Sequence, residues 1–450
     1  MDLSCFKAYD LRGRVPDQLN PALAEKIGRA YVEIAGAKRV IVGYDIRLSS
    51  PDIAEALSSG LMAAGADVFD IGLCGTEQVY FATSHYQMDG GIMVTASHNP
   101  KDHNGMKMVG PESRPISSDN GLNDIRDRVL EPFSDAAEQG KYETLEVMSA
   151  YVDHLLGYID AGSLKPMTIV CNAGNGGAGL VIDELEQHLP FDFTKVHHEA
   201  DGHFPNGVPN PILPENRSAT ADAVLQNGAA MGIAWDGDYD RCFFFDETGR
   251  FIEGYYIVGL LADQFLRKTG GGKVIHDPRL TWNTLDLVEA AGGEAIESKT
   301  GHAFIKQRMR DEDAVYGGEM SAHHYFRDFA YCDSGMIPWL LVAERLCQSG
   351  QTLSSLIDAR IEAYPASGEI NRTISDPPKV IAAIEAKYGV GAKSVSHVDG
   401  LSVEFDNWRF NLRMSNTEPV VRLNVEARGD KALMEAKTEE LLEEMKRLNV

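Results

Sequence analysis

The segment Gly91–Lys107 reads GIMVTASHNPKDHNGMK and joins an apolar run to a polar loop. Residues 92–94 indicate a buried strand that ends where the polar residues begin. Such loops often carry functional residues in α/β proteins, because the sheet fixes the base of the loop while its tip stays exposed. The Asn104–Gly105 pair predicts a turn inside the loop. By itself Ser97 would be interpreted as a turn former or a helix cap, so its role depends on the rest of the chain.

Alternating helix and strand patterns surround this segment. The spacing of apolar residues predicts helices over residues 21–35 and 76–86 and another that begins at residue 50. Runs of β-branched residues predict strands over residues 39–43 and 67–71. This alternation predicts a parallel or mixed sheet with helices on both faces.

The same order of elements recurs along the chain. Strands that begin near residues 40, 168 and 273 each run into an Asp or Asn and a turn. Later in each block a second strand ends in a polar loop; these loops lie in residues 92–99, 231–241 and 314–324. We therefore expect three similar mixed-sheet α/β domains, each of which contributes one loop from the C-terminal end of a strand.

The last part of the chain has a different pattern. A strand, a helix, a hairpin, a further strand and a charged amphipathic helix are predicted over residues 369–374, 378–388, 401–412, 420–426 and 431–448. This order predicts a smaller α+β C-terminal domain with an antiparallel sheet. The expected domains, arranged around a central cleft, are residues 1–145, 146–250, 251–366 and 367–450.

Composition narrows the class of function. The chain has 450 residues, 44% hydrophobic and 24% charged, as in a globular protein too long for one core. No apolar run approaches the roughly 20 residues of a membrane span, and six scattered cysteines without a Cys-x-x-Cys pair favour reduced thiols in the cytoplasm. A net charge of −25 argues against nucleic-acid and anionic-membrane partners. An anionic substrate would then need cations gathered in loops, and the candidates are Arg12, Lys107, Arg241, Arg279, Arg413 and Arg422.

Residues 236–241, Asp-Gly-Asp-Tyr-Asp-Arg, place three carboxylates at alternate positions after an apolar strand. These carboxylates would repel one another unless a cation lies among them, and Mg²⁺ prefers such oxygen ligands. A calcium loop of the EF-hand type, with Glu247 as its last ligand, is the competing interpretation. It requires Gly where Arg241 stands and a flexible loop where residues 242–245 indicate a strand. An acidic turn in solvent is disfavoured by the apolar residues on both sides.

A metal site would change the interpretation of Ser97. A phosphate on this serine would carry close to two negative charges and three acceptor oxygens, which a metal ion and Arg241 could hold. His98 and Lys107 lie near Ser97 in sequence and could assist proton transfer, although a single His or Lys in a loop is more often solvated.

Two further loops carry candidate binding groups. Glu319 and Ser321 would point the same way if their segment is extended, which suits adjacent sugar hydroxyls. The loop Arg413–Pro419, RMSNTEP, joins two strands and predicts a phosphate nest to which Arg422 adds charge. A polar hairpin turn is the alternative, but a turn does not need this set of side chains.

These four loops, in this order, resemble the α-D-phosphohexomutase superfamily over the whole chain. Residues 6–12 (FKAYDLR) and 299–302 (KTGH) are similar to two further signatures of that family. The resemblance implies catalytic roles for Ser97, Lys107, His98, Arg241, Arg12 and His302, and metal binding by Ser97, Asp236, Asp238 and Asp240. It implies substrate binding by Tyr9, Arg279, Thr300, Gly301, Glu319, Ser321 and His323, and phosphate binding by Arg413, Ser415, Asn416, Thr417 and Arg422.

Within this superfamily, Glu-Met-Ser at residues 319–321 resembles the phosphomannomutase and phosphoglucomutase branch, most of all the bacterial enzymes of GDP-mannose synthesis. Two positions depart from relatives that act on both sugars: Arg279 stands where they often have Lys, and Glu418 where they often have Thr. Both bear on sugar preference.

The resemblance implies an isomerase that interconverts mannose 1-phosphate and mannose 6-phosphate. The reaction would proceed through a phosphoserine and a bound hexose 1,6-bisphosphate, with Mg²⁺ as cofactor. A phosphoglucomutase or dual-specificity phosphohexomutase is the alternative, and a magnesium-dependent sugar-phosphate phosphohydrolase is the alternative from another class. We expect a small-molecule hexose phosphate as the partner, no nucleic acid or membrane, and a monomer or small homo-oligomer.

Overall fold

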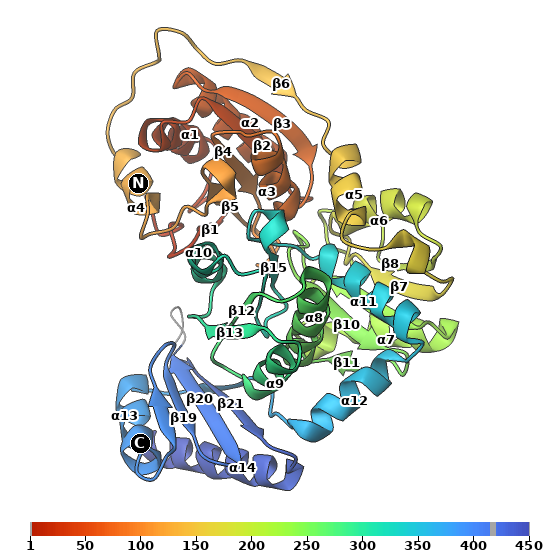
Figure 1. The fold of residues 1–450 in the computed structure, drawn as a ribbon. Helices are drawn as coiled ribbons and strands as arrows, with labels where there is room; N and C mark the ends of the chain where they lie inside the picture. Colours follow the sequence, from red (N-terminus) through yellow and green to blue (C-terminus); the bar gives the residue numbers. More distant parts are fainter. Residues whose placement is uncertain (1, 415–419, 450) are drawn as a thin grey trace. The chain divides into compact units, whose positions relative to one another are not determined.

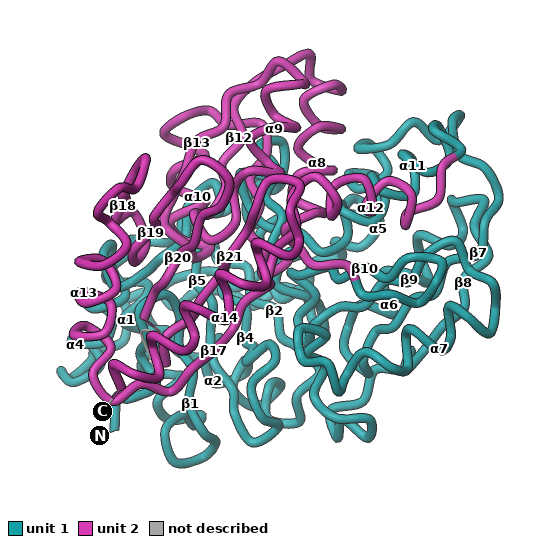
Figure 2. Tube along the Cα trace, turned by 90° about the horizontal axis from the view of Figure 1, so that it is seen from below, with its two compact units in different colours: residues 1–251, 323–350 teal, residues 252–322, 351–450 magenta. Residues whose placement is uncertain are grey.

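The computed structural model describes residues 2–414 and 420–449 of the chain. The chain forms two compact units (Figure 2): unit 1 contains residues 1–251 and 323–350, and unit 2 contains residues 252–322 and 351–450. The segment 323–350 thus joins the unit formed by the first half of the chain. Within the described ranges, no helix combines the length and the apolar character that crossing a bilayer requires.

The first sheet of unit 1 is mixed, as the alternating pattern predicts. Its strands lie in the order β1 (Leu11–Arg14), β5 (His103–Val109), β4 (Gly90–Val94), β2 (Arg39–Tyr44), β3 (Asp67–Leu73) and β6 (Tyr142–Thr144). Strand β2 is parallel to β3 and β4, whereas β5 is antiparallel to β4 and β1. The helices of this part are α1 (Pro21–Ala35), α2 (Ser50–Ala63), α3 (Thr76–His85) and α4 (Leu122–Arg128) (Figure 1).

Helix α1 shows why the local predictions hold. Asn20 caps its start by accepting a hydrogen bond from the Leu23 backbone N–H at 3.0 Å, and Pro21 suits the first turn. Gly36 ends the helix in a left-handed conformation with φ of 65°. These end signals are local, so the helix has the predicted bounds.

The predicted turn at Asn104–Gly105 is wrong. The chain reverses over residues 97–102, and both residues lie inside β5. A Cβ on Gly105 would lie 1.9 Å from the Leu11 carbonyl oxygen, so glycine is needed here for the close approach of β1. The glycine of this Asn-Gly pair is therefore required by the packing of two strands and not by a turn.

The second sheet of unit 1 has the order β11 (Phe251–Ile252), β10 (Cys242–Asp246), β9 (Met231–Trp235), β7 (Thr168–Asn172) and β8 (Asp192–Val196). Strand β7 is parallel to β8 and β9, and β10 returns antiparallel to β9. The remaining helices and strands of this unit are α5 (Met148–Leu156), α6 (Ala178–Leu185), α7 (Ser218–Asn227), β15 (His324–Phe326), β16 (Cys332–Asp333) and α11 (Ile337–Ser349). Since β10 is a buried strand that begins at residue 242, the calcium-loop interpretation is wrong.

Unit 2 begins with α/β elements. Its parallel strands lie in the order β13 (Glu294–Glu297), β12 (Lys273–His276) and β14 (Tyr316–Gly318). The helices around them are α8 (Gly254–Thr269), α9 (Trp282–Ala290), α10 (His302–Glu312) and α12 (Leu353–Ala363).

The end of the chain forms the predicted antiparallel sheet. Its order is β17 (Ile370–Thr373), β21 (Val420–Ala427), β20 (Trp408–Met414), β19 (Leu401–Glu404) and β18 (Ser394–Ser396). Helices α13 (Pro377–Tyr388) and α14 (Lys431–Leu448) pack against it (Figure 1). Buried apolar residues such as Phe410, Leu423 and Leu441 form its core.

Candidate active site

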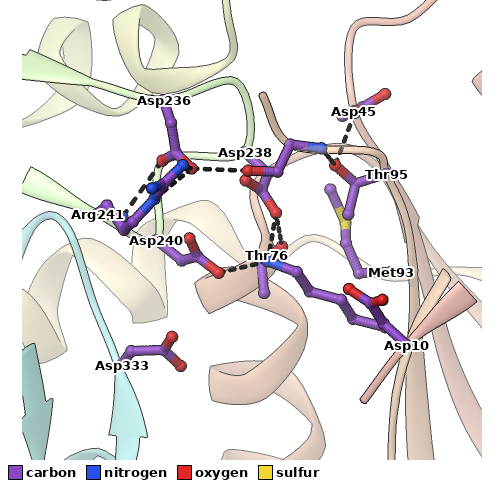
Figure 3. Close-up of polar contacts among 12 residues, drawn as sticks. Asp10, Asp45, Thr76, Met93, Thr95, Asp236, Asp238, Asp240, Arg241 and Asp333 are labelled. Carbon is purple, nitrogen blue, oxygen red and sulfur yellow. Dashed lines mark hydrogen bonds and ion pairs between the residues drawn. The ribbon is translucent and has the colours of Figure 1, made fainter. Parts of the chain in front are cut away.

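The loop after β4 holds Ser97 in a strained and buried position. Its φ is 48°, in the left-handed region that residues other than glycine rarely adopt, and only 3% of the residue is exposed. The Thr95 hydroxyl accepts a hydrogen bond from the Ser97 N–H at 2.9 Å and donates to Asp45 at 2.7 Å (Figure 3). Ser97 is thus held by its own loop and by the loop after β2.

Arg47 supports the same loop and was missed by the sequence analysis. Its buried guanidinium donates to the backbone carbonyls of Ser97, Asn99, Pro100 and His103 at 2.6–2.9 Å. The strand order could have predicted this contact. Strands β2 and β4 are parallel neighbours, so the residues that follow them meet at one edge of the sheet.

The acidic loop after β9 lies directly against Ser97. A Cβ on residue 237 would lie only 2.5 Å from the Ser97 carbonyl oxygen, which is too close. The two loops can therefore approach each other this closely only because residue 237 is glycine. The Ser97 hydroxyl donates to Asp236 Oδ2 at 2.7 Å, and Arg241 Nε donates to the same oxygen at 2.9 Å. Figure 3 shows the contacts between Asp236 and Arg241.

Lys107 neutralises the other two aspartates. Its ammonium Nζ lies 2.7 Å from Asp238 Oδ2 and 2.5 Å from Asp240 Oδ2. Burial would lower the pKa of Lys107, but Asp238 and Asp240 outweigh burial and raise it. Burial would likewise raise the pKa of Asp238, but Lys107 and Arg12 hold it well below its usual range. Lys107 is therefore a cation, and Asp238 an anion, at neutral pH.

The three aspartates fit a divalent cation. Oxygens of Asp236, Asp238 and Asp240 lie within 4.8 Å of one another. The Oδ1 atoms of Asp238 and Asp240 are buried and have no hydrogen-bond partner among the described residues. Unpaired buried carboxylate oxygens are costly without a cation, and carboxylate oxygens suit Mg²⁺. Thr76, at the start of α3, donates to Asp238 Oδ2 at 2.5 Å and so helps to orient this carboxylate (Figure 3).

His98 and Arg12 border this cluster. Arg241 Nη2 lies 2.6 Å from His98 Nδ1 and, because a guanidinium can only donate, we assign Nδ1 as the acceptor and the ring proton to Nε2. Arg12 lies on β1, binds Asp10 at 2.9 Å and Asn99 at 3.0 Å, and pairs across the sheet with Gly105. Tyr9 is half-buried in the bend before β1.

His323 lies in unit 1, beside the acidic loop. It forms an antiparallel bridge with Arg241, and its Nδ1 is 2.9 Å from Asp333 Oδ2. Asp240, His323 and Asp333 form a second group whose ligand atoms lie within 4.8 Å of one another. Glu319 and Ser321, which precede His323 in sequence, belong to unit 2.

In unit 2, Arg279 is held rigidly after β12. Its guanidinium makes two contacts of 2.9 Å with Asp277, and the side chain is 3% exposed. Arg409 on β20 donates to the backbone carbonyls of Pro278 and Arg279 at 2.8 and 3.1 Å. Arg409 is thus a second residue that sequence reasoning missed, because only the fold brings β20 to this loop.

The segment around Glu319 is a turn, so the condition of an extended backbone is not met. The Ala322 N–H donates to the Glu319 carbonyl at 3.0 Å, and Ala322 has φ of 71°. The side chains of Glu319 and Ser321 still lie near one group, since Arg279 Nη2 is 3.9 Å from Glu319 and 3.3 Å from Ser321. The carboxylate of Glu319 also accepts from the Gly301 N–H at 2.8 Å.

The neighbouring loop begins α10. The Thr300 N–H donates to Asp399 at 3.3 Å, and His302, half-buried, is the first residue of the helix. Ser415, Asn416 and Thr417 of the predicted phosphate nest lie outside the described residues.

The arginines at the two ends of that loop converge on Glu369 together with Arg279. Glu369 oxygens lie 3.4 Å from each of Arg279, Arg413 and Arg422. Arg413 also lies 3.8 Å from Asp399. The Nε atoms of Arg413 and Arg422 are buried and have no hydrogen-bond partner among the described residues. This cluster can hold an anion.

Comparison with known proteins identifies the family. The chain matches the phosphoglucomutase/phosphomannomutase models of α/β/α domains I, II and III and of the C-terminal domain, over residues 4–134, 149–249, 253–364 and 369–443. The chain belongs to the phosphoglucomutase/phosphomannomutase family. It has the four domains of this family, three with mixed sheets and a C-terminal one with an antiparallel sheet.

Members of the family match over nearly the whole chain. A protein of Xanthomonas campestris named phosphohexose mutases is 60% identical, covering 98% of this chain and 99% of its own. A phosphomannomutase of Escherichia coli is 59% identical over 449 residues, 98% of each chain. The crystal structure of a family protein from Burkholderia thailandensis superposes with a TM-score of 0.89 at 33% identity, covering 100% of this chain and 98% of that one.

Proposed function

We propose that the protein is a phosphomannomutase that interconverts mannose 1-phosphate and mannose 6-phosphate. The observation that carries the proposal is the Ser97 hydroxyl, which lies 2.7 Å from Asp236 in a buried cluster of three carboxylates. Curated relatives of 54–59% identity named phosphomannomutase support the choice of mannose.

In the proposed reaction, phosphorylated Ser97 donates its phosphoryl group to the free hydroxyl of the bound monophosphate. The bond from phosphorus to Ser97 Oγ breaks as a bond to the sugar oxygen forms, which yields a hexose 1,6-bisphosphate. The intermediate turns over without leaving, and its other phosphate returns to Ser97. Asp236, Asp238 and Asp240 would hold Mg²⁺, which neutralises charge on the transferred group.

The residues around Ser97 would act through position and charge. Arg241 and Lys107 are cations close to the site of transfer, and both can bind phosphoryl oxygens. Arg12 would add a third cation. We propose that His98, whose Nδ1 contacts Arg241, orients this guanidinium in the ligand-free protein.

A mutase, unlike a phosphatase, needs a grip on the phosphate that does not react. We propose that Arg413 and Arg422 provide it with Ser415, Asn416 and Thr417. We propose further that the substrate is bound by Tyr9, Arg279, Thr300, Gly301, Glu319, Ser321 and His323, and that His302 has a catalytic role. The buried, unpaired Nε donors of Arg413 and Arg422 support the proposal for the arginines.

The accompanying proposals follow from the same reasoning. The domain boundaries lie near residues 145, 250 and 366, the protein acts in the cytoplasm as a monomer or small homo-oligomer, and its product supplies GDP-mannose synthesis. A dual-specificity mutase is the second candidate, which the relative named phosphohexose mutases favours.

The test is to incubate the protein with mannose 1-phosphate, Mg²⁺ and a trace of hexose 1,6-bisphosphate. Mannose 6-phosphate is the expected product, whereas stoichiometric inorganic phosphate would indicate a phosphohydrolase. Ser97→Ala should lose at least about a thousandfold in kcat; full activity in this variant would rule out the phosphoserine. Turnover of glucose 1-phosphate at a comparable kcat/KM would favour the dual-specificity candidate.

A further inference from the structure

Glu369 stands at the centre of the arginine cluster in unit 2. It lies just before β17, its side chain is 22% exposed, and its two oxygens contact Arg279, Arg413 and Arg422. Three guanidinium groups this close would repel one another without an anion between them. Burial would raise the pKa of Glu369, but the three arginines outweigh burial and lower it, so the carboxyl is ionised at neutral pH.

The contacts of Glu369 are long for paired charges. All three are 3.4 Å, whereas charge-assisted N–H···O bonds are typically about 2.7–2.9 Å. Asp277, in the same cluster, meets that standard with two contacts of 2.9 Å to Arg279. Glu369 is therefore shared among three cations and is committed to none of them.

The cluster has unused capacity for an anion. Buried Nε donors of Arg413 and Arg422 have no partner among the described residues, although each could donate one more hydrogen bond. Burial, and after it the proximity of Arg279, lowers the pKa of Arg413, whereas Glu369 and Asp399 oppose the shift. A phosphate monoester has three acceptor oxygens and close to two negative charges, so it satisfies more of these donors than one carboxylate can.

We propose that Glu369 is a built-in counter-ion that holds Arg279, Arg413 and Arg422 together in the ligand-free protein and competes with phosphate for them. A bound phosphate gains less binding free energy than three free arginines would give it. It must either displace the Glu369 carboxylate from the arginines or share them with it. Under the proposed function, on which this part rests, the competition weakens the grip on the unreacting phosphate enough for the bisphosphate to turn.

Binding of inorganic phosphate and of mannose 6-phosphate tests this without turnover. We expect Glu369→Gln to bind both about tenfold more tightly than the native protein at low ionic strength, because one competing charge has been removed. Glu369→Asp, which keeps the charge, should stay within about threefold of the native affinity. Glu404→Gln is the matched control: it removes a carboxylate that pairs with Lys393 at the surface of the same sheet and should leave affinity unchanged.

Thermal unfolding separates competition from loss of structure. Glu369→Gln should have a lower Tm without ligand, from unrelieved repulsion, and a larger rise in Tm with inorganic phosphate than the native protein. In the mutase assay the same variant should show a lower KM and a lower kcat. Unchanged or weaker phosphate binding by folded Glu369→Gln would overturn the proposal. If the native protein has no mutase activity but Glu369→Gln still binds phosphate more tightly than the native protein, the counter-ion role is supported and only the proposed function is rejected.

Discussion

The two charged clusters of the protein are built on opposite plans. In unit 1 two of the three carboxylates share one cation, Lys107, at 2.5–2.7 Å, while the third, Asp236, pairs with Arg241 at 2.8 Å. In unit 2 three arginines share one anion, Glu369, at 3.4 Å, while Asp277 pairs with Arg279 at 2.9 Å. Among the described residues, the buried ligand atoms without partners are carboxylate oxygens of Asp238 and Asp240 in the first cluster and guanidinium nitrogens of Arg413 and Arg422 in the second. Each cluster thus contains a shared internal ion of the opposite sign and spare capacity for a ligand of that sign.

The difference in contact distance indicates how each internal ion will respond to a ligand. The short contacts of Lys107 stabilise the acidic cluster strongly, so a metal ion has to displace a well-bound ammonium. The long contacts of Glu369 stabilise the arginine cluster less, so a phosphate meets a weaker competitor. Three substitutions in unit 1 test whether its charged groups behave in this way.

The largest effect is expected from Asp238→Asn. The amide removes one charge from the acidic cluster and turns an acceptor of Lys107 and Thr76 into a mixed donor. We expect kcat to fall about a thousandfold, as is typical when an electrostatic contact in a buried site is lost, and Mn²⁺ binding measured by electron paramagnetic resonance to weaken severely. Glu247→Gln, in the turn after β10, is the control and should leave both quantities unchanged. An equal loss in this variant would show that the effect of Asp238→Asn is not specific to the acidic cluster.

An intermediate effect is expected from Lys107→Met. The variant leaves Asp238 and Asp240 buried without their cation, which should cost about 3 kcal/mol of stability without metal. Mg²⁺ should restore Tm more than in the native protein and bind about tenfold more tightly, while kcat falls. Calorimetric titration and thermal unfolding measure the two quantities. If Mg²⁺ binds this variant no better than the native protein, Lys107 is not a competitor and the parallel with Glu369 fails.

The smallest effect concerns Glu77, a buried carboxylate of unit 1 whose hydrogen-bond donors, Tyr151, Ser334, Gly335 and Met336, are all uncharged. Burial raises its pKa to about 8, although these donors oppose the shift. As pH rises from about 4.5 to 8, the unfolded chain loses this proton first, so the folded state loses stability over this window. We expect Tm to fall by several degrees over this window, because each unit of difference in pKa corresponds to about 1.4 kcal/mol of stability.

Glu77→Gln cannot ionise and should lack this part of the pH dependence of Tm. The exposed Glu184→Gln on α6 is the control and should keep the native slope. Equal slopes in the native protein and in Glu77→Gln would show that Glu77 is ionised throughout. Glu426 of unit 2 is also a buried carboxylate, but it pairs with the Arg409 guanidinium at 2.8 Å. Glu77 has no such cationic partner among its hydrogen-bond donors named above.

Much of the site could be predicted from local sequence. Alternating carboxylates after an apolar strand are hard to explain without a cation, and the structure places Asp236, Asp238 and Asp240 together. Ser97 could be predicted as their neighbour only through the resemblance to a family, because 139 residues separate it from Asp236. The Asn104–Gly105 turn was wrong because the same pair of residues suits a close strand contact.

Local sequence was enough to predict the helices, the strands and the residue types of the loops. Helix ends such as Asn20 and Gly36, the buried strands and the acidic triad depend on neighbours a few residues away, which periodicity and composition report. The shared counter-ions of the two clusters, by contrast, follow from the fold. Lys107, Glu369 and the supporting Arg47 act through partners 44 to 133 residues away. Their roles depend on which side chains the fold brings within about 4 Å, where charges in a dry environment interact strongly, and no local pattern reports that distance.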